Sequence, residues 1–165
     1  MPLYLDTLTA ADLEHVGANL RPYDRDELAV MDYGEEKWRT HLGQPYSYAL
    51  RTPQGRPVAV GGAVKPEDHE PLHGLPECLP APVSSYCFLW GFGTPEAEKS
   101  WQQIHRQVKA FLRYLNVAEA GRTPAVLVWE GHGASLRWLG RLGFKVAGPT
   151  FLGRDSEPVV FLEKN

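Results

Sequence analysis

The sequence has few cysteines, no excess of basic residues and no long hydrophobic run. Its two cysteines, Cys78 and Cys87, are too few for a disulfide framework, and their spacing matches no zinc ribbon or redox motif. The 17 Lys and Arg are scattered and are balanced by 20 Asp and Glu, which argues against the basic face of a nucleic-acid-binding protein. We therefore expect reduced thiols in a cytoplasmic protein that does not bind nucleic acid.

Membrane and secretion signals are also missing. No window approaches the roughly 18 apolar residues of a membrane span, and residues 1–16 carry acidic groups where a signal peptide would be basic and then apolar. With 165 residues, 43% of them hydrophobic, the chain is expected to form one globular domain over residues 1–165. We expect a monomer or homodimer that has no membrane partner.

Residues 69–73, HEPLH, have the spacing of H-E-x-x-H, in which two histidines one helical turn apart bind zinc. Pro71 occupies the middle of this motif, and further prolines lie on both sides of it. Because a proline inside a helix costs about 3 kcal/mol, we predict a loop here and not a helical zinc site. Two alternatives stay open: a solvated surface loop, or a folded loop in which His69, His73 and Cys78 meet around a metal.

Hydrophobic periodicity and turn residues predict the order of the elements. The expected strands and helices are a strand at 3–8, helices at 10–19, 24–33 and 35–42, a hairpin of 47–52 and 57–64, a strand at 84–90, a helix at 95–117, a strand at 125–129, a helix at 133–142 and a hairpin of 145–153 and 158–164. This order predicts an α/β (α+β) fold with a mixed, partly parallel central sheet of about seven strands flanked by helices.

Three local signals support the boundaries of the predicted helices. Thr9, with Asp12 three residues later, has the pattern of a capping box. Thr94 is a suitable N-cap and Pro95 a suitable first residue for the long helix. Gly143 follows the last helix, where a left-handed C-cap is expected.

The segment HGASLRWLGRLGF (132–144) resembles the fourth helix of GCN5-related N-acetyltransferases. Ser135, Trp138, Leu139 and the run Leu142-Gly143-Phe144 carry the match. The order of elements is similar to that family over essentially the whole chain. The resemblance implies an acetyl-CoA-dependent N-acyltransferase acting on an amine of a small molecule or protein.

Two other segments, 8–28 and 88–97, resemble acetyltransferase-like proteins of short-tailed bacteriophages. Those proteins show a Leu-Arg-x-x-Asp-x-x-Glu run after the first helix, which Leu20, Arg21, Asp24 and Glu27 match. This narrower resemblance implies a phage protein that works in the host bacterial cytoplasm or within the virion.

The resemblance also implies a cofactor site after the central strand. The family's Gly-rich diphosphate loop corresponds to WGFGTPEAEK (90–99), which keeps the Gly-x-Gly but has Phe88 at the Gln/Arg position. Glu96 and Glu98 lie in the first turn of the following helix, where they would repel a diphosphate, and Lys99 could offset one of these charges. The cofactor contacts implied are Trp90, Gly91, Phe92, Gly93, Thr94, Lys99 and Ser135.

Candidate catalytic groups lie near the last helix. The position of the family's tyrosine is Leu139, which has no proton to donate. His132 and Glu130 are the candidate acid and base, with a helix-flanking histidine and a solvated carboxylate as the alternatives. Arg21 and Asp24 are expected to bind the acceptor or to form a local ion pair.

Two hypotheses follow from these residues. The first is the acyltransferase. The second is a protein that keeps the fold without catalysis and binds a host or virion protein.

Overall fold

The computed structural model describes residues 2–68, 79–148 and 150–165. The strands are β1 (Tyr4–Thr7), β2 (Ser47–Arg51), β3 (Pro57–Val64), β4 (Tyr86–Gly93), β5 (Thr123–Trp129), β6 (Phe144–Val146), β7 (Phe151–Leu152) and β8 (Pro158–Lys164). The α-helices are α1 (Ala10–Ala18), α2 (Pro22–Val30), α3 (Glu35–Arg39), α4 (Glu96–Lys99), α5 (Trp101–Ala118) and α6 (Gly133–Arg141). Short 3₁₀ helices are η1 (Pro66–Asp68), η3 (Val83–Ser85) and η4 (Arg154–Ser156).

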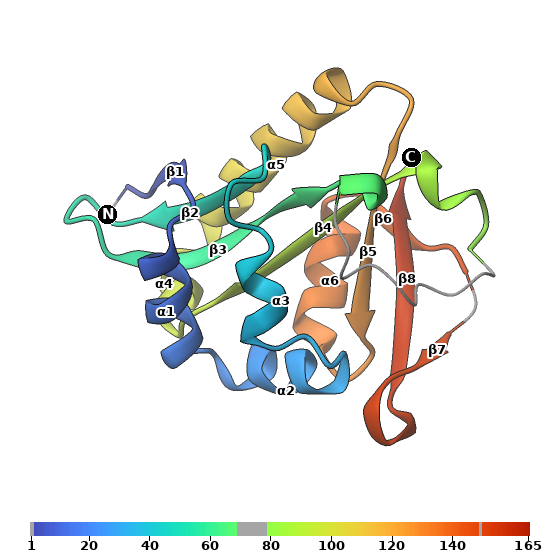
Figure 1. Cartoon of the computed structure of the whole chain (residues 1–165), viewed down its shortest axis with the longest axis horizontal. Helices are drawn as coiled ribbons and strands as arrows, with labels where there is room; N and C mark the ends of the chain where they lie inside the picture. The colour runs from blue at the N-terminus through green and yellow to red at the C-terminus, as the bar shows by residue number, and fades with distance from the viewer. Residues whose placement is uncertain (1, 69–78, 149) are drawn as a thin grey trace.

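The described strands form one mixed sheet in the order β1-β2-β3-β4-β5-β8-β6, with β7 paired to β8 (Figure 1). Within this sheet β4 and β5 are parallel and every other described pair is antiparallel. The predicted mixed, partly parallel sheet is therefore confirmed, with eight strands rather than about seven. The insertion of β8 between β5 and β6 was not predicted, because no local pattern specifies which strands become neighbours.

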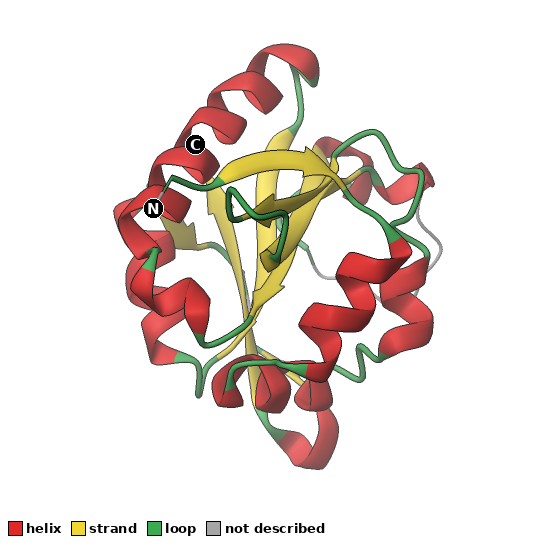
Figure 2. Cartoon of the chain, turned by 90° about the vertical axis from the view of Figure 1, so that its left-hand side faces the viewer, coloured by secondary structure: helices red, strands yellow, loops and turns green. Residues whose placement is uncertain are grey.

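Helices cover both faces of the twisted sheet (Figure 2). On one face, α1 and α3 pack through Leu13, Val16 and Trp38 against Val60 and Phe92, and Leu28 of α2 packs against the same cluster. On the opposite face, α5 and α6 bury the apolar stripe that the sequence predicts, in clusters that include Leu112, Leu115 and Leu139. We call these the α2/α3 face and the α5/α6 face. Alternation along each strand assigns neighbouring residues to opposite faces.

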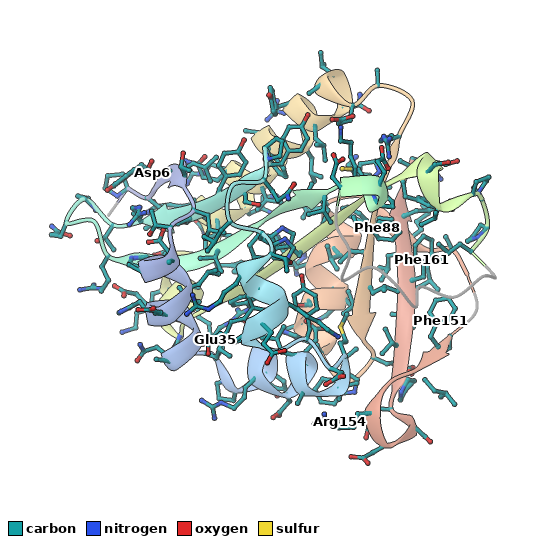
Figure 3. The ribbon with its side chains drawn as sticks, viewed as in Figure 1. Asp6, Glu35, Phe88, Phe151, Arg154 and Phe161 are labelled. Carbon is teal, nitrogen blue, oxygen red and sulfur yellow. The ribbon has the colours of Figure 1, made fainter. Side chains whose placement is uncertain are left out.

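Aromatic side chains hold the middle of the sheet on the α2/α3 face. Phe88 of β4 and Phe161 of β8 lie with ring centroids 6.5 Å apart across β5, and Phe151 packs against the same cluster (Figure 3). Phe161 is fully buried. These contacts tie the C-terminal strand into the centre of the fold.

Local signals place the first and last helices as expected. The Thr9 side chain accepts from the Asp12 N–H and the Asp12 carboxylate accepts from the Thr9 N–H, which confirms the capping box at α1. Gly143 has φ +98°, the left-handed conformation predicted after α6. Helix α2 begins at Pro22, two residues earlier than expected, because proline is well suited to the first turn.

The prediction of one continuous helix over residues 95–117 was wrong. Ser100 leaves the helical conformation, ends α4 and begins α5. Thr94 is also not the side-chain cap of this helix, because its hydroxyl donates to the Val58 carbonyl oxygen at 3.0 Å instead. The tertiary contact with β3 therefore replaces the local cap that the sequence suggested.

Candidate functional site

The two parallel strands β4 and β5 pair over only part of their length. Their register runs from Tyr86–Thr123 to Phe88–Ala125 and ends there, although β4 continues to Gly93 and β5 to Trp129. Beyond Phe88 the strands separate, so their facing backbone groups do not pair with each other. This separation opens a gap in the centre of the sheet.

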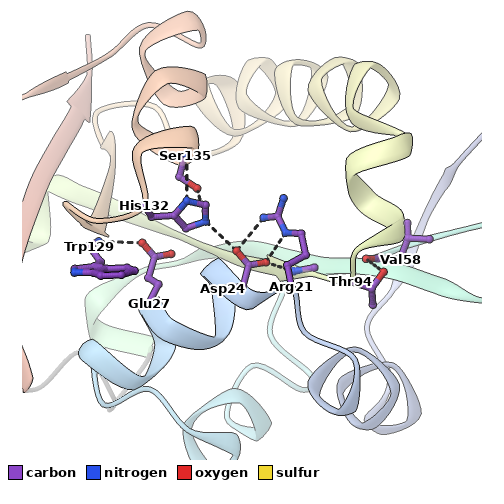
Figure 4. A network of polar contacts seen from close by, with 9 residues as sticks. Arg21, Asp24, Glu27, Val58, Thr94, Trp129, His132 and Ser135 are labelled. Atoms are coloured by element: carbon purple, nitrogen blue, oxygen red, sulfur yellow. Dashed lines mark hydrogen bonds and ion pairs between the residues drawn. The ribbon is translucent and has the colours of Figure 1, made fainter.

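Helix α2 lies across the far end of this gap. The Asp24 carboxylate accepts from the Gly93 N–H at the end of β4, with an oxygen–nitrogen distance of 2.7 Å. One helical turn later, the Glu27 carboxylate accepts from the Trp129 N–H at the end of β5, at 2.9 Å (Figure 4). Two acidic side chains thus satisfy the strand-end amides that the separation leaves without a ladder partner.

Asp24 is the centre of a buried polar network. Besides the Gly93 amide, it accepts two hydrogen bonds of 2.9 Å from the Arg21 guanidinium and faces His132 Nε2 at 3.0 Å. Only 3% of Asp24 is exposed. Burial by itself raises the pKa of Asp24, but the donors His132, Arg21 and Gly93 outweigh it and the pKa is lowered. Asp24 therefore stays ionised and fastens α2 to β4 and α6.

His132 caps the start of α6. Its Nδ1 accepts from the Ser135 N–H at 3.4 Å, which leaves the proton on Nε2 to be donated to Asp24. The Ser135 hydroxyl contacts the same Nε2 at 3.0 Å. A Ser–His–Asp triad requires the serine and the aspartate on different ring nitrogens, so these three residues do not form one. Only 2% of His132 is exposed.

Glu27 differs from Asp24 in its partners. One hydrogen bond, from the Trp129 N–H, reaches its carboxylate among the described residues, and the side chain is half-buried. Burial is the main cause that raises the pKa of Glu27 to about 7; the Asp24 charge adds to this, and His132 and Arg21 oppose it. A carboxyl with a pKa near 7 can release and accept a proton at neutral pH.

A cavity of about 410 Å³ passes through the sheet at the gap. On the α2/α3 face its wall includes Glu27, Tyr33 and Trp90, and on the α5/α6 face it includes Val108 and Trp138. Most of the other lining side chains are aliphatic or aromatic. The gap therefore joins two apolar compartments on opposite faces of the sheet, with Glu27 as the carboxylate that can change its protonation.

The cavity contains most of the residues to which the resemblance assigns a binding role. Those in its lining are Arg21, Asp24, Trp90, Gly91, Phe92, Gly93 and Ser135. Thr94 and Lys99, also assigned to the cofactor, are not among the lining residues, and neither are the candidate catalytic residues Glu130 and His132. Glu130 is exposed. Catalytic roles for Glu130 and His132 stay predictions.

At the acidic start of α4, the charge of Glu96 has a partner that the sequence did not predict. The Glu96 carboxylate forms two hydrogen bonds, of 3.1 and 2.6 Å, with the Arg56 guanidinium. This contact lowers the pKa of Glu96 and offsets its charge. The repulsion of a diphosphate expected from Glu96 is therefore weaker than the sequence suggested, because Arg56 of the β2–β3 turn compensates its charge in addition to Lys99.

Aromatic side chains of α5 and α6 contact each other at the wall of the cavity on the α5/α6 face. The indole rings of Trp101 and Trp138 meet edge to face with centroids 4.6 Å apart, and the Trp138 N–H donates to His105 Nδ1 at 3.0 Å. The Arg21 guanidinium lies 5.8 Å from the Trp101 ring centroid. These contacts connect the first turns of α5 to α6 and to the α2 network.

The metal alternative falls largely outside what the structure describes. His69, His73 and Cys78 lie outside the described residues. Within residues 2–68, 79–148 and 150–165, no group of three or more histidine, cysteine or acidic residues could hold a metal ion. Of the helices described there, none has the length and hydrophobicity needed to cross a bilayer.

Several solved structures superpose on this chain over almost its whole length. A protein described as a phosphinothricin N-acetyltransferase superposes with a TM-score of 0.67 and 12% identity over 99% of this chain and 98% of the other. A GCN5-related N-acetyltransferase from Kribbella flavida gives 0.65 and 14% over 98% and 96%. A chimeric spermidine N-acetyltransferase from Vibrio cholerae gives 0.63 and 13% over 99% and 95%.

No family model and no curated protein matches the sequence. At 12–14% identity, the structural likeness establishes the fold: the chain has the mixed sheet and flanking helices of GCN5-related N-acetyltransferases. The expectation for the fold is thereby confirmed. Nothing in these comparisons bears on the resemblance to phage proteins.

Sequence reasoning gave no role to Glu27, although it matched the Leu-Arg-x-x-Asp-x-x-Glu run. The available signal was the spacing of Asp24 and Glu27, which puts both carboxylates on one face of a helix. That signal did not reveal that the two ends of separate strands would lie beneath them.

Proposed function

We propose that this protein transfers an acyl group from a coenzyme A thioester to an amine of a small molecule or protein. The observation that carries the proposal is the gap between β4 and β5, at which a cavity is lined by residues from both faces of the sheet. Two reactants can approach such a gap from opposite faces of the sheet. The fold shared with N-acetyltransferases supports the same reaction class.

Acetyl-CoA is the donor that the resemblance implies, and its two ends fit differently. The amide-bearing arm fits the gap, because backbone groups of β4 beyond Phe88 face β5 without pairing to it. Trp90 to Gly93 and Ser135 would hold this arm. The diphosphate end would meet Glu96, whose charge Arg56 offsets, and Glu98. When bound, the thioester supplies an electrophilic carbonyl carbon.

Glu27 is the proton acceptor in this proposal. Its carboxylate lines the cavity at the end of β5 and is held by the Trp129 N–H. It would take one proton of the ammonium group, which frees the nitrogen lone pair to form the C–N bond as the C–S bond breaks. The second proton that the nitrogen loses would pass to the leaving thiolate. The Arg21–Asp24–His132 network holds α2, β4 and α6 in place around this carboxylate.

The test is calorimetric titration of acetyl-CoA into the purified protein and into Glu96→Gln/Glu98→Gln. Micromolar binding by the natural sequence, followed by thioester consumption with an amine panel, is the expected result. Binding by neither protein would refute acetyl-CoA as the donor. Binding gained only by the double variant would mean that the two carboxylates close the site.

A second candidate function is a binding protein that retains the fold without catalysis. The observation in its favour is the contact between Trp101 and Trp138, which joins α5 to α6 where a ligand would pass. In that case the protein binds no coenzyme A species. Its partner would be a host or virion protein, to be captured from infected cells.

We also propose, from the resemblance of residues 8–28 and 88–97 alone, that the chain is phage-encoded. It would then act in the cytoplasm of an infected bacterium or within the virion. Immunoblotting of purified virions and of infected-cell cytoplasm distinguishes the two locations, and absence of the protein from both refutes the proposal.

A further inference from the structure

The cavity extends well beyond the gap, along the α5/α6 face of the sheet. Alternation places Ala59, Gly61 and Gly91 on this face, where Gly61 and Gly91 are cross-strand partners. All three line the cavity, as do Val108 and Phe111 of α5 opposite them. Small residues in the sheet thus leave space beneath the apolar stripe of α5. We call this part of the cavity the α5 groove.

The solvent exposure of the residues around the α5 groove also indicates that no side chain fills it. Val108 and Phe111 belong to the inward stripe of α5, yet both are only half-buried. Gly91, on a central strand, is exposed, and Leu89 beside it is half-buried. Interior positions of a sheet covered by a helix are ordinarily closed by close packing. Here an apolar surface stays accessible between two packed elements.

The cavity is larger than the gap itself. Its volume of about 410 Å³ includes both the gap, where the amide-bearing arm of the donor would lie, and the α5 groove beside it. The α5 groove is continuous with the β4–β5 gap through Leu89, Gly91 and Val126. Among the described lining residues on α5 and on the strand face opposite it, none is charged, which suits a hydrocarbon group attached to something that reacts at the gap.

We propose that the acyl donor carries a medium-length aliphatic chain, which lies in the α5 groove with its thioester in the gap. This inference rests on the proposed function. Each buried methylene strengthens binding about fourfold. An octanoyl thioester therefore binds far more tightly than an acetyl thioester if the groove holds its chain.

The test is calorimetric titration of coenzyme A, acetyl-CoA and octanoyl-CoA into the same protein. We expect octanoyl-CoA to bind at least about a hundredfold more tightly than acetyl-CoA, given the methylene increment. Similar affinities for the two thioesters would overturn the inference while leaving acyl transfer in place. Weaker binding of octanoyl-CoA would overturn it in the same way.

A thioester without the nucleotide separates this inference from the proposed function. If no coenzyme A species binds, acyl transfer from coenzyme A fails. Octanoyl-N-acetylcysteamine then tests the groove alone: its binding, with none of the acetyl counterpart, supports a chain site, and no binding of either overturns it.

A matched pair of variants on α5 locates the chain. Val108→Trp fills the α5 groove, and we expect the ratio of octanoyl-CoA to acetyl-CoA affinity to fall toward one. Val117→Trp is the control, because Val117 lies on the same helix and is 78% exposed, and the ratio should not change. An unchanged ratio in a folded Val108→Trp protein would place the chain elsewhere and overturn the inference.

Discussion

Asp24 and Glu27 are carboxylates one turn apart on α2, yet their surroundings give them opposite properties. Asp24 accepts from Arg21, His132 and the Gly93 amide, and its pKa is lowered. Glu27 accepts from the Trp129 amide, and burial raises its pKa to about 7. The number and charge of the donors therefore decide which carboxylate holds the structure together and which can exchange a proton.

The largest expected effect is on stability at Asp24. Asp24→Asn removes the charge that pairs with Arg21 and leaves a half-buried guanidinium without its partner, so we expect a loss of about 3–5 kcal/mol in the free energy of unfolding. Urea denaturation measures it. The control Asp26→Asn, exposed on the same helix, should change little. Equal losses in both variants would mean that the network does not stabilise the fold.

The next effect is on activity at Glu27. Glu27→Gln keeps an oxygen that can accept from the Trp129 N–H but cannot take up a proton. We expect kcat to fall at least about a hundredfold. In the natural protein the rate should rise as Glu27 loses its proton near pH 7, and in the variant this rise should disappear. Thioester consumption measures both. Glu130→Gln, an exposed carboxyl just after β5, is the control. The reverse outcome would assign the base to Glu130.

A third effect concerns the pH dependence of stability. The pKa of Glu27 is about 7 in the folded protein against an ordinary value of 4.5, so the folded state binds the proton more tightly. The free energy of unfolding should therefore fall as pH rises from about 4.5 to about 7, by an amount on the order of 2 kcal/mol after allowance for partial exposure.

Melting curves of the natural protein and of Glu27→Gln across this pH range measure the effect as the difference between them. Above pH 7 the difference should stay constant. A constant difference across the whole range would contradict the raised pKa.

The smallest effect is expected at the exposed counterpart of the Arg21–Asp24 pair. Arg56 and Glu96 also form a two-bond ion pair, but both side chains are accessible to solvent. Exposed pairs often contribute nothing measurable to stability. Glu96→Gln should therefore unfold at the same urea concentration as the natural protein, and a clear loss would show that burial is not what separates the two pairs.

Local patterns predicted most elements because their causes are local. The capping box of Thr9 and Asp12, the apolar stripe of α5 and the left-handed Gly143 each depend on residues within a few positions. The predicted continuous helix at 95–117 is broken at Ser100. At Thr94 the hydroxyl donates to the carbonyl oxygen of Val58 on β3, and this contact outweighs the local cap. Trp90 to Gly93 are cofactor contacts in the family resemblance, but their place beside the gap depends on the order of the strands as well.

The sequence by itself determined the mixed α/β class, the order of elements and the apolar faces, since periodicity and turn chemistry act between near neighbours. Only the tertiary structure decided that β4 and β5 separate, that Asp24 and Glu27 meet their two ends, and that space remains beneath α5. Strands some 35 residues apart along the chain are brought together by packing, and the surroundings of a carboxylate exist only once that packing is complete.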